Sequence, residues 1–368
     1  MVEARIDSET GGWSVMAPRR AARPDDGRAP AAPGSCPFCP GNEGMTPPEV
    51  LRVPAGARDW RVRVVPNLYA ATGERGPTDP AGTGGPGLPG RPEPSPGGPA
   101  SSPEPDLAMP FTGRHEVVIE SAQHDWDLRR GDPDQVAEIL SAMRERCRAL
   151  ADGGAAAITV FRNYGARAGA SLAHPHSQIV ALDLADGAGS ARLAPRHDPD
   201  ESRDHWLPPG LADRWRRARE HHERTGECLH DTLAAAERRA GDRVVLDDGG
   251  VLVFQPRAAS VPHQTTLLPA GRGAGLAEAS DRDLTALAAT LPRVLSGLAA
   301  VLDDPAYNLV VHAGPVGDPT GHRWYRWHLT IYPRLTTVGG LEFATGVSVN
   351  PSPPESTAPV LRQAIAGR

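Results

Sequence analysis

The run His174-Pro175-His176-Ser177-Gln178 combines residue types that covalent phosphoryl chemistry needs. Its two histidines stand at positions i and i+2, so both imidazole rings fall on one face if the segment is extended. One ring can then bind a metal while the other meets a substrate. A neutral imidazole that attacks phosphorus, with the Gln178 amide donating to a phosphoryl oxygen, predicts nucleotidyl transfer through a covalent intermediate. The alternative is a pair of histidines on a surface loop.

A loop of small residues precedes this run. Residues 163–171 read Asn-Tyr-Gly-Ala-Arg-Ala-Gly-Ala-Ser, and the backbone amides of such a loop can approach a phosphate closely. This context favours the catalytic interpretation of His176 over a surface loop.

Cys36 and Cys39 form a C-x-x-C pair, for which zinc binding and thiol redox chemistry are the two functional interpretations. Prolines at 37 and 40 and a glycine at 41 favour a turn over the helix start that a redox pair uses. Two sulfurs make half of a tetrahedral site, and His124 and His174 beside expected strands are candidates to complete it. A buried pair of cysteines without metal is the alternative.

The elements that must position these residues follow a repeated order. Apolar residues at spacings of three and four predict an amphipathic helix within residues 133–152, followed by strands at 158–161 and 176–182. The second half repeats helix, strand, loop and a strand with a histidine, at 284–302, 308–311 and 327–332. The repetition predicts an α+β protein of two similar halves, each an antiparallel sheet with a packed helix.

Composition restricts the function classes. The 368 residues carry 39 basic and 45 acidic side chains, a net charge of -6, without a sustained basic stripe, which argues against a nucleic-acid surface. Four cysteines do not resemble a disulfide framework, so we expect a reducing cytoplasm. We expect no leader segment, because residues 1–10 carry charged side chains without an apolar core, and no stretch that approaches the roughly 18 apolar residues of a membrane helix. We expect a soluble protein that does not act on membranes.

Two polar stretches mark the organisation of the chain. Residues 73–110 are dominated by Gly, Pro, Ser and Asp, which predicts a flexible surface insertion inside a domain. A second polar stretch at 192–204 predicts a boundary between an N-terminal catalytic domain, 1–191, and a C-terminal domain, 192–368.

Five motifs occur in the order expected of the galactose-1-phosphate uridylyltransferase family, which the chain resembles over nearly its whole length outside the Pro/Gly insertion. They are residues 17–24 (APRRAARP), 36–43 (CPFCPGNE), 65–70 (VPNLYA), 163–178 and 327–333 (WHLTIYP). This family is a branch of the histidine-triad superfamily built from two tandem half-domains, which agrees with the repeated order of elements.

The resemblance implies roles for individual residues. His176 matches the nucleophile and Gln178 the residue that holds the phosphoryl oxygens, while Cys36, Cys39, His124 and His174 match the ligands of a structural zinc. His124 fits the ligand position directly after its strand, so His115 is expected only to begin that strand. Positions that match substrate contacts are Arg20, Arg23, Asn67, Asn163, Gly169, Ser171 and Glu342, the last facing the sugar.

The implied reaction is ping-pong. A nucleoside diphosphate sugar gives its nucleotidyl group to His176 and releases sugar 1-phosphate, and a second phosphate-bearing acceptor removes the group. Uridylyl exchange between UDP-glucose and a hexose 1-phosphate is the main expectation, and the family implies a homodimer.

Some residues depart from the uridylyltransferase pattern. Ser177 stands where the best-known members have Gly. Ser177 and residues 333–342 and 346–351 look more like the sister group of ADP-glucose phosphorylases, which pass an adenylyl group to phosphate. The alternatives are therefore an adenylyltransferase of that group, or a histidine-triad relative that hydrolyses or only binds nucleotides.

Overall fold

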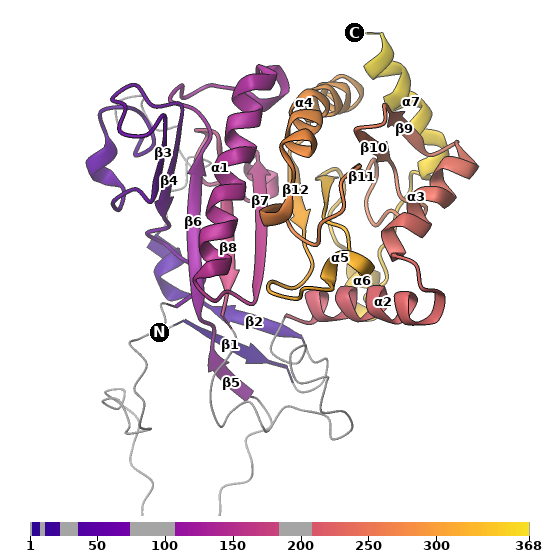
Figure 1. Cartoon of the computed structure of the whole chain (residues 1–368), viewed down its shortest axis with the longest axis horizontal. Helices are drawn as coiled ribbons and strands as arrows, with labels where there is room; N and C mark the ends of the chain where they lie inside the picture. The colour runs from indigo at the N-terminus through magenta and orange to yellow at the C-terminus, as the bar shows by residue number, and fades with distance from the viewer. Residues whose placement is uncertain (1, 8–11, 23–35, 74–106, 184–207, 368) are drawn as a thin grey trace, which may run out of the picture.

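The computed structural model describes residues 2–7, 12–22, 36–73, 107–183 and 208–367. Most of its strands form one ten-stranded sheet in which every neighbouring pair is antiparallel (Figure 1). In spatial order these strands are β3 (Leu51–Val53), β4 (Val62–Pro66), β6 (Gly113–Ile119), β8 (His176–Leu182), β7 (Ala157–Tyr164), β12 (Tyr307–His312), β13 (His328–Pro333), β11 (Thr265–Pro269), β10 (Val251–Phe254) and β9 (Val244–Asp247).

The pairing of β7 with β12 joins the two parts of the chain. Five strands of the sheet come from residues before 184 and five from residues after 208, and the pairing places Tyr164 opposite Tyr307 and Val160 opposite Val311. The expected α+β class with antiparallel strands is confirmed, and the sheets of the two parts are continuous. The expected division into two half-domains stays a prediction, because the proposed boundary at 191 lies outside the described residues.

Helices α1 (Pro133–Asp152) and α4 (Asp281–Leu302) lie side by side against one face of this sheet (Figure 1). Helix α1 begins where Asp132 accepts a hydrogen bond from the Asp134 amide, with Pro133 at the first helical position. The apolar stripe that predicted the helix is buried: Val136, Ile139, Leu140, Met143, Cys147 and Leu150. The predicted boundaries of this helix therefore agree with the structure.

Helix α4 is more apolar than the sequence analysis expected. By length and composition it would suffice to cross a membrane, but 56% of its most apolar window is buried. It is a core helix, packed against α1, the sheet and α7 (Pro354–Ala366). Gly297 lets α7 approach closely, since an added Cβ would lie 2.7 Å from Ile365.

The opposite face of the sheet is covered in part by α2 (Pro209–Thr225), whose Trp215 is buried against Val180 and Leu182 of β8. The remaining helices of the described part are α3 (Leu229–Ala240), α5 (Gly321–Trp324), α6 (Gly340–Thr345) and short 3-10 turns at Pro18–Ala22, Glu43–Met45, Leu128–Arg130, Ala166–Ala168 and Leu276–Glu278.

A second, three-stranded sheet has the order β2 (Trp13–Met16), β1 (Glu3–Ile6), β5 (Leu107–Pro110). The predicted bounds of the flexible insertion, 73–110, were wrong at the C-terminal end, because residues 107–110 form strand β5 and pair with β1. The backbone amide of Gly73 also donates a hydrogen bond to the carbonyl oxygen of Phe111, at 2.8 Å. Residues 74–106 of the predicted insertion lie outside the described residues.

Gly113, at the start of β6, offers a test of the register between β6 and β8. Its φ is +154°, and an added Cβ would lie 2.0 Å from the carbonyl oxygen of Ala181. We expect Gly113→Ala to lower the free energy of unfolding by about 2 kcal/mol or more, because backbone must move. Gly210→Ala is the matched control, since nothing lies within 4 Å of its Cβ. Equal melting temperatures for both variants in a thermal denaturation scan would contradict this assignment.

Candidate active site

Strand β8 carries His176 and Gln178 and is paired with β6 on one side and β7 on the other. Its side chains alternate between the two faces of the sheet. Ile179 and Ala181 point into the core that α1 and α4 cover. His176 and Gln178 therefore share the opposite face. His174, which was predicted to share a face with His176 in an extended segment, lies just before β8.

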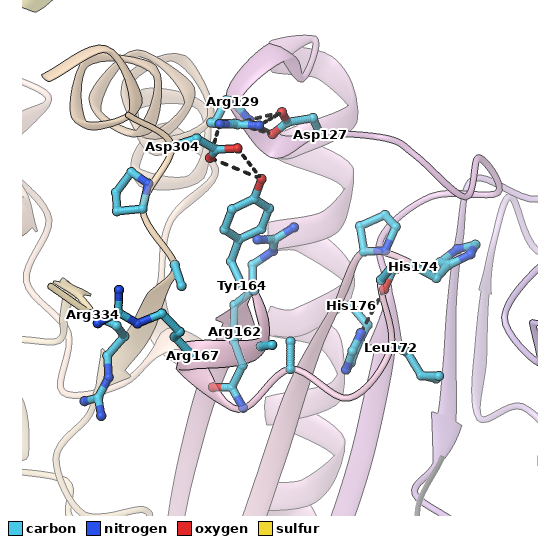
Figure 2. Close-up of a pocket in the computed structure, with 18 of the residues that line it drawn as sticks. Asp127, Arg129, Arg162, Tyr164, Arg167, Leu172, His174, His176, Asp304 and Arg334 are labelled. Atoms are coloured by element: carbon cyan, nitrogen blue, oxygen red, sulfur yellow. Dashed lines mark hydrogen bonds and ion pairs between the residues drawn. The ribbon is translucent and has the colours of Figure 1, made fainter. Parts of the chain in front are cut away.

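A hydrogen bond places a hydrogen on Nδ1 of the His176 ring, so a neutral ring has a single tautomer here. Its Nδ1 lies 2.9 Å from the carbonyl oxygen of His174, and because a carbonyl oxygen can only accept, Nδ1 carries the hydrogen. The lone pair is then on Nε2, the atom able to attack phosphorus. The side chain is buried, with 8% of its surface exposed, and lines a cavity of about 820 Å³ (Figure 2).

Gln178 contacts a residue to which the sequence analysis gave no role. Its Oε1 lies 2.9 Å from Nε2 of His115, and Nδ1 of His115 accepts the amide hydrogen of Ala71 at 3.0 Å. His115 therefore does more than begin β6, as had been expected of it. The period of two along β6 was the available signal, since His115, Val117 and Ile119 fall on the face that carries His176.

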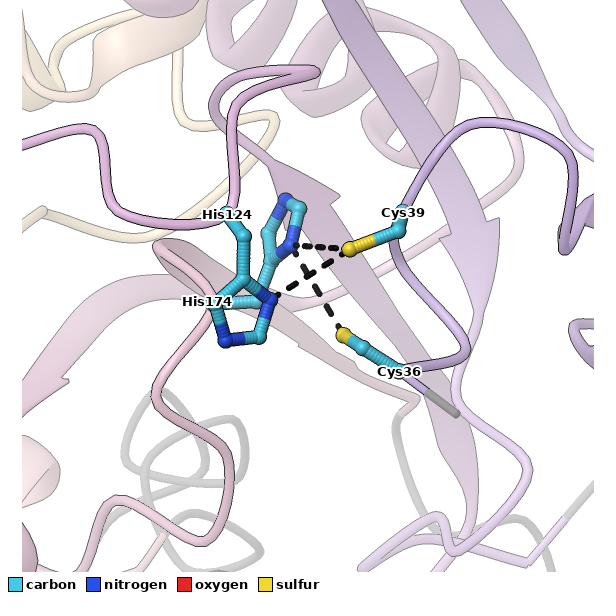
Figure 3. Close-up of side chains that lie close together, drawn as sticks. All are labelled: Cys36, Cys39, His124 and His174. Carbon is cyan, nitrogen blue, oxygen red and sulfur yellow. Dashed lines mark hydrogen bonds between the residues drawn. The ribbon is translucent and has the colours of Figure 1, made fainter. Parts of the chain in front are cut away.

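Cys36, Cys39, His124 and His174 converge as the motif match predicted, with their ligand atoms all within 4.8 Å of one another (Figure 3). Nδ1 of His124 lies 3.3 Å from Sγ of Cys39, and Nδ1 of His174 lies 3.7 and 3.6 Å from the two sulfurs. Tetrahedral zinc, with Zn–S about 2.3 Å and Zn–N about 2.05 Å, separates S and N ligands by about 3.6 Å. The four residues thus fit a tetrahedral metal ion of this kind.

The hydrogen bonds and burial of this cluster suit metal ligands. Nε2 of His174 donates to the carbonyl oxygen of Ser121 at 2.8 Å, which leaves Nδ1 for a metal. Burial lowers the pKa of His174 to about 4, so the ring is neutral at pH 7. Burial also raises the pKa of the Cys36 thiol to about 11, so a thiolate at this position needs a cation beside it.

The Cys2His2 cluster and His176 both contact Phe38, which lies between the two cysteines in sequence. Its ring contacts His174 edge to face at 5.9 Å and His176 at 5.4 Å between centroids. The turn that holds the cysteines therefore also fixes one wall beside the nucleophile.

Ser177 belongs to a buried polar chain on the face of the sheet opposite His176. Its hydroxyl donates to Glu120 at 2.6 Å, and Glu120 pairs with Arg162 at 3.0 Å. Arg162 in turn donates to the Tyr307 hydroxyl at 2.8 Å. A glycine at 177 would leave this carboxylate with one hydrogen bond fewer, which gives the departure from the uridylyltransferase pattern a physical role.

The large cavity has a charged wall that the sequence analysis missed. Arg129 is bonded to Asp127 and Asp304, and the Tyr164 hydroxyl also donates to Asp304 (Figure 2). Beyond them, Arg167 and Arg334 lie on the far side of the cavity from His176, without a carboxylate partner in the described part of the chain (Figure 2). These side chains come from four separate segments of the chain, and only Tyr164 and Arg167 fall within a motif of the sequence analysis.

The predicted substrate contacts fall into two groups. Asn163 and Ser171 line the large cavity, while Asn67 and again Ser171 line a smaller one of about 80 Å³ beside His176 and Gln178. The others lie off these walls: Arg20 donates to the carbonyl of Tyr69, Gly169 approaches Asn163, and Glu342 accepts from the amide of Gly339. Arg23 lies outside the described residues.

The metal cluster predicts the behaviour of a cysteine variant. Cys36→Ser should lose the metal and about 3 kcal/mol of stability, the contribution of a ligand present at roughly a hundred times its Kd. Metal content by elemental mass spectrometry and a thermal denaturation scan measure both effects. Cys228→Ser, a buried cysteine far from the cluster, is the control and should keep the metal. Full metal content and an unchanged melting temperature in Cys36→Ser would contradict the assignment.

Comparisons with known proteins agree with this geometry. The family model described as galactose-1-phosphate uridyl transferase, N-terminal domain, matches residues 107–185. The ADP-glucose phosphorylase of Arabidopsis thaliana is 30% identical to this chain over 98% of this chain and 92% of its own.

Solved structures extend the likeness to the whole fold. An ADP-glucose phosphorylase from Arabidopsis thaliana with bound ADP-glucose has a TM-score of 0.69 and 29% identity, and covers 99% of this chain and 98% of that one. A uridylyltransferase structure has a TM-score of 0.73 and 27% identity, and covers 99% of both chains. By the full-length similarity and the family match over β5 to β8, this chain belongs to the galactose-1-phosphate uridylyltransferase family, as its motifs predicted.

Proposed function

We propose that the protein transfers the nucleotidyl group of a nucleoside diphosphate sugar to His176 and then to a phosphate-bearing acceptor. The observation that carries this proposal is the tautomer of His176, which places a lone pair on Nε2 of a buried ring that lines the cavity. We propose further that the donor is ADP-glucose and the acceptor inorganic phosphate.

The first half-reaction needs no proton transfer. Nε2 of His176 attacks the α-phosphorus, a P–N bond forms, and the P–O bond to the sugar phosphate breaks, with sugar 1-phosphate leaving with the electron pair. The ring becomes cationic, and the hydrogen bond from its Nδ1 to the His174 carbonyl grows stronger as the charge develops. In the second half-reaction an acceptor oxygen attacks phosphorus and the P–N bond breaks, which restores the neutral ring.

The two cavities that meet at His176 suit the two ends of such a substrate. The small cavity is lined by apolar side chains, including Phe38, Val65, Leu68 and Leu172, a suitable wall for a flat nucleobase. The large cavity has the arginines, and Arg167 and Arg334 supply positive charge for phosphate groups. His176 lies between them, where the α-phosphate joins the nucleoside to the rest of the donor.

We assign Cys36, Cys39, His124 and His174 to a structural zinc ion. The ion would hold the turn around Phe38 against the segment that precedes β8, and four protein ligands leave no open coordination position for water. Its contribution is therefore to position His174 and Phe38, while the chemistry belongs to His176.

The choice of adenylyl over uridylyl transfer is supported by two observations. The similarity to an ADP-glucose phosphorylase at 30% identity covers almost the entire chain. Ser177, a feature of that group in the sequence analysis, is built into the buried contacts of Glu120. Uridylyl transfer from UDP-glucose to a hexose 1-phosphate remains the second candidate, because the family model and the solved uridylyltransferase also match.

Intact-protein mass spectrometry tests the proposal. The native chain is incubated briefly with ADP-glucose or with UDP-glucose and quenched at alkaline pH, where a phosphoramidate survives. We expect an adenylyl adduct on the native chain and none on His176→Ala, whose turnover should fall by about a thousandfold or more.

His328→Ala is the matched control, because His328 also begins a strand and its Nδ1 also donates to a carbonyl two residues earlier, at 3.0 Å. This variant should keep the adduct. A uridylyl adduct alone would move the protein to the second candidate. Rapid release of nucleotide from both donors without any acceptor would identify a hydrolase and contradict both. A cytoplasmic location and a homodimer stay predictions from the sequence.

A further inference from the structure

We propose that His115 is a positioning residue for the transfer reaction: it turns the carboxamide of Gln178 so that the NH₂ group, and not the oxygen, faces the phosphoryl group on His176. The proposal rests on the proposed function of His176 and Gln178. His115 lies outside the five sequence motifs, and its hydrogen bonds to Ala71 and Gln178 define how it would act.

The backbone fixes the tautomer of His115. The amide N–H of Ala71 lies 3.0 Å from Nδ1, and because an amide N–H can only donate, Nδ1 must hold a lone pair. A neutral ring then carries its hydrogen on Nε2. The side chain is 5% exposed, and a doubly protonated ring would set a second N–H against that of Ala71.

In the described part of the chain, two side-chain atoms lie close to this Nε2–H group. Oε1 of Gln178 lies 2.9 Å away. Nδ2 of Asn67 lies at 3.1 Å, but the Tyr69 amide donates to Oδ1 of Asn67 at 2.9 Å, so the group that Asn67 turns to His115 is its NH₂. Since an NH₂ group cannot take this hydrogen, the bond goes to Gln178.

The orientation of Gln178 follows from this bond. With Oε1 committed to His115, the NH₂ group takes the other side of the carboxamide. Gln178 lines the small cavity together with His176 and shares its face of β8. The reversed carboxamide would place two donors against each other at His115 and present an oxygen to the negative phosphoryl oxygens. His115 therefore selects the orientation that stabilises the developing charge.

A double-mutant cycle tests the proposal by the single-turnover rate of nucleotidyl transfer from ADP-glucose, with UDP-glucose as second donor. His115→Phe keeps a planar ring and removes both nitrogens, and we expect the rate to fall about tenfold to a hundredfold, as for loss of part of an oxyanion site. Gln178→Leu should fall at least as far. The double variant should be no slower than Gln178→Leu alone, because His115 acts through Gln178.

His222→Phe, a histidine on α2 away from the cavities, is the control and should keep the native rate. Two results would overturn the proposal while leaving the proposed function intact. One is a native transfer rate in folded His115→Phe. The other is a fully additive loss in the double variant, which indicates a general structural role.

The tautomer is measured independently of activity by NMR of protein with ¹⁵N-labelled histidine, assigning His115 by its absence from the His115→Phe spectrum. We expect a neutral ring with hydrogen on Nε2, and faster exchange of that hydrogen in Gln178→Leu. A ring with hydrogen on Nδ1 overturns the proposal. If the native chain forms no adduct with either donor, the proposed function fails, and this measurement still decides how His115 orients Gln178.

Discussion

The site depends on the pairing of β8 with strands on both of its sides. Hydrogen bonds to β6 and β7 leave β8 no freedom to slip, and a shift of one residue would move His176 and Gln178 to the face that α1 and α4 cover. The same pairing brings His115 close to Gln178 and Arg162 next to Ser177. The positions of His176, Gln178 and the polar chain behind them are thus consequences of one register.

The Cys2His2 cluster holds the residues just before β8, which the strand pairing does not fix. His174 lies ahead of the strand, and its ring is held by the Ser121 carbonyl on one side and the two sulfurs on the other. Because the His174 carbonyl accepts from His176, the cluster and the orientation of the His176 ring are linked through a single residue. A turn that is distant in sequence is therefore connected to His176 through backbone geometry.

Sequence patterns predicted those features that depend on neighbours along the chain. The stripe from Val136 to Leu150 predicted helix α1, and the family resemblance predicted the four residues whose side chains converge in the Cys2His2 cluster. His115, Arg129 and Asp304 were missed because their roles depend on partners from other strands and loops, which periodicity cannot identify. The strand at residues 107–110, Leu-Ala-Met-Pro, was missed because it is short and directly follows the Pro/Gly segment, while its structure comes from pairing with β1. The length of the apolar stretch in α4 was also underestimated. This helix is packed against α1, α7 and the sheet, and a helix buried in this way needs few polar residues.

The junction between β7 and β12 has a consequence for how the chain can be divided. Asn308 donates to both Asn163 and the carbonyl of Ala168, and Tyr164 stacks on Tyr307 at 5.0 Å, so the wall of the cavity is built across this junction. If the N-terminal part were produced alone, β7 would become an edge strand of eight residues with unpaired backbone groups. Such an edge invites pairing with any other exposed strand. The C-terminal part therefore also covers the β7 edge of the part that carries His176 and protects that edge from pairing with other chains.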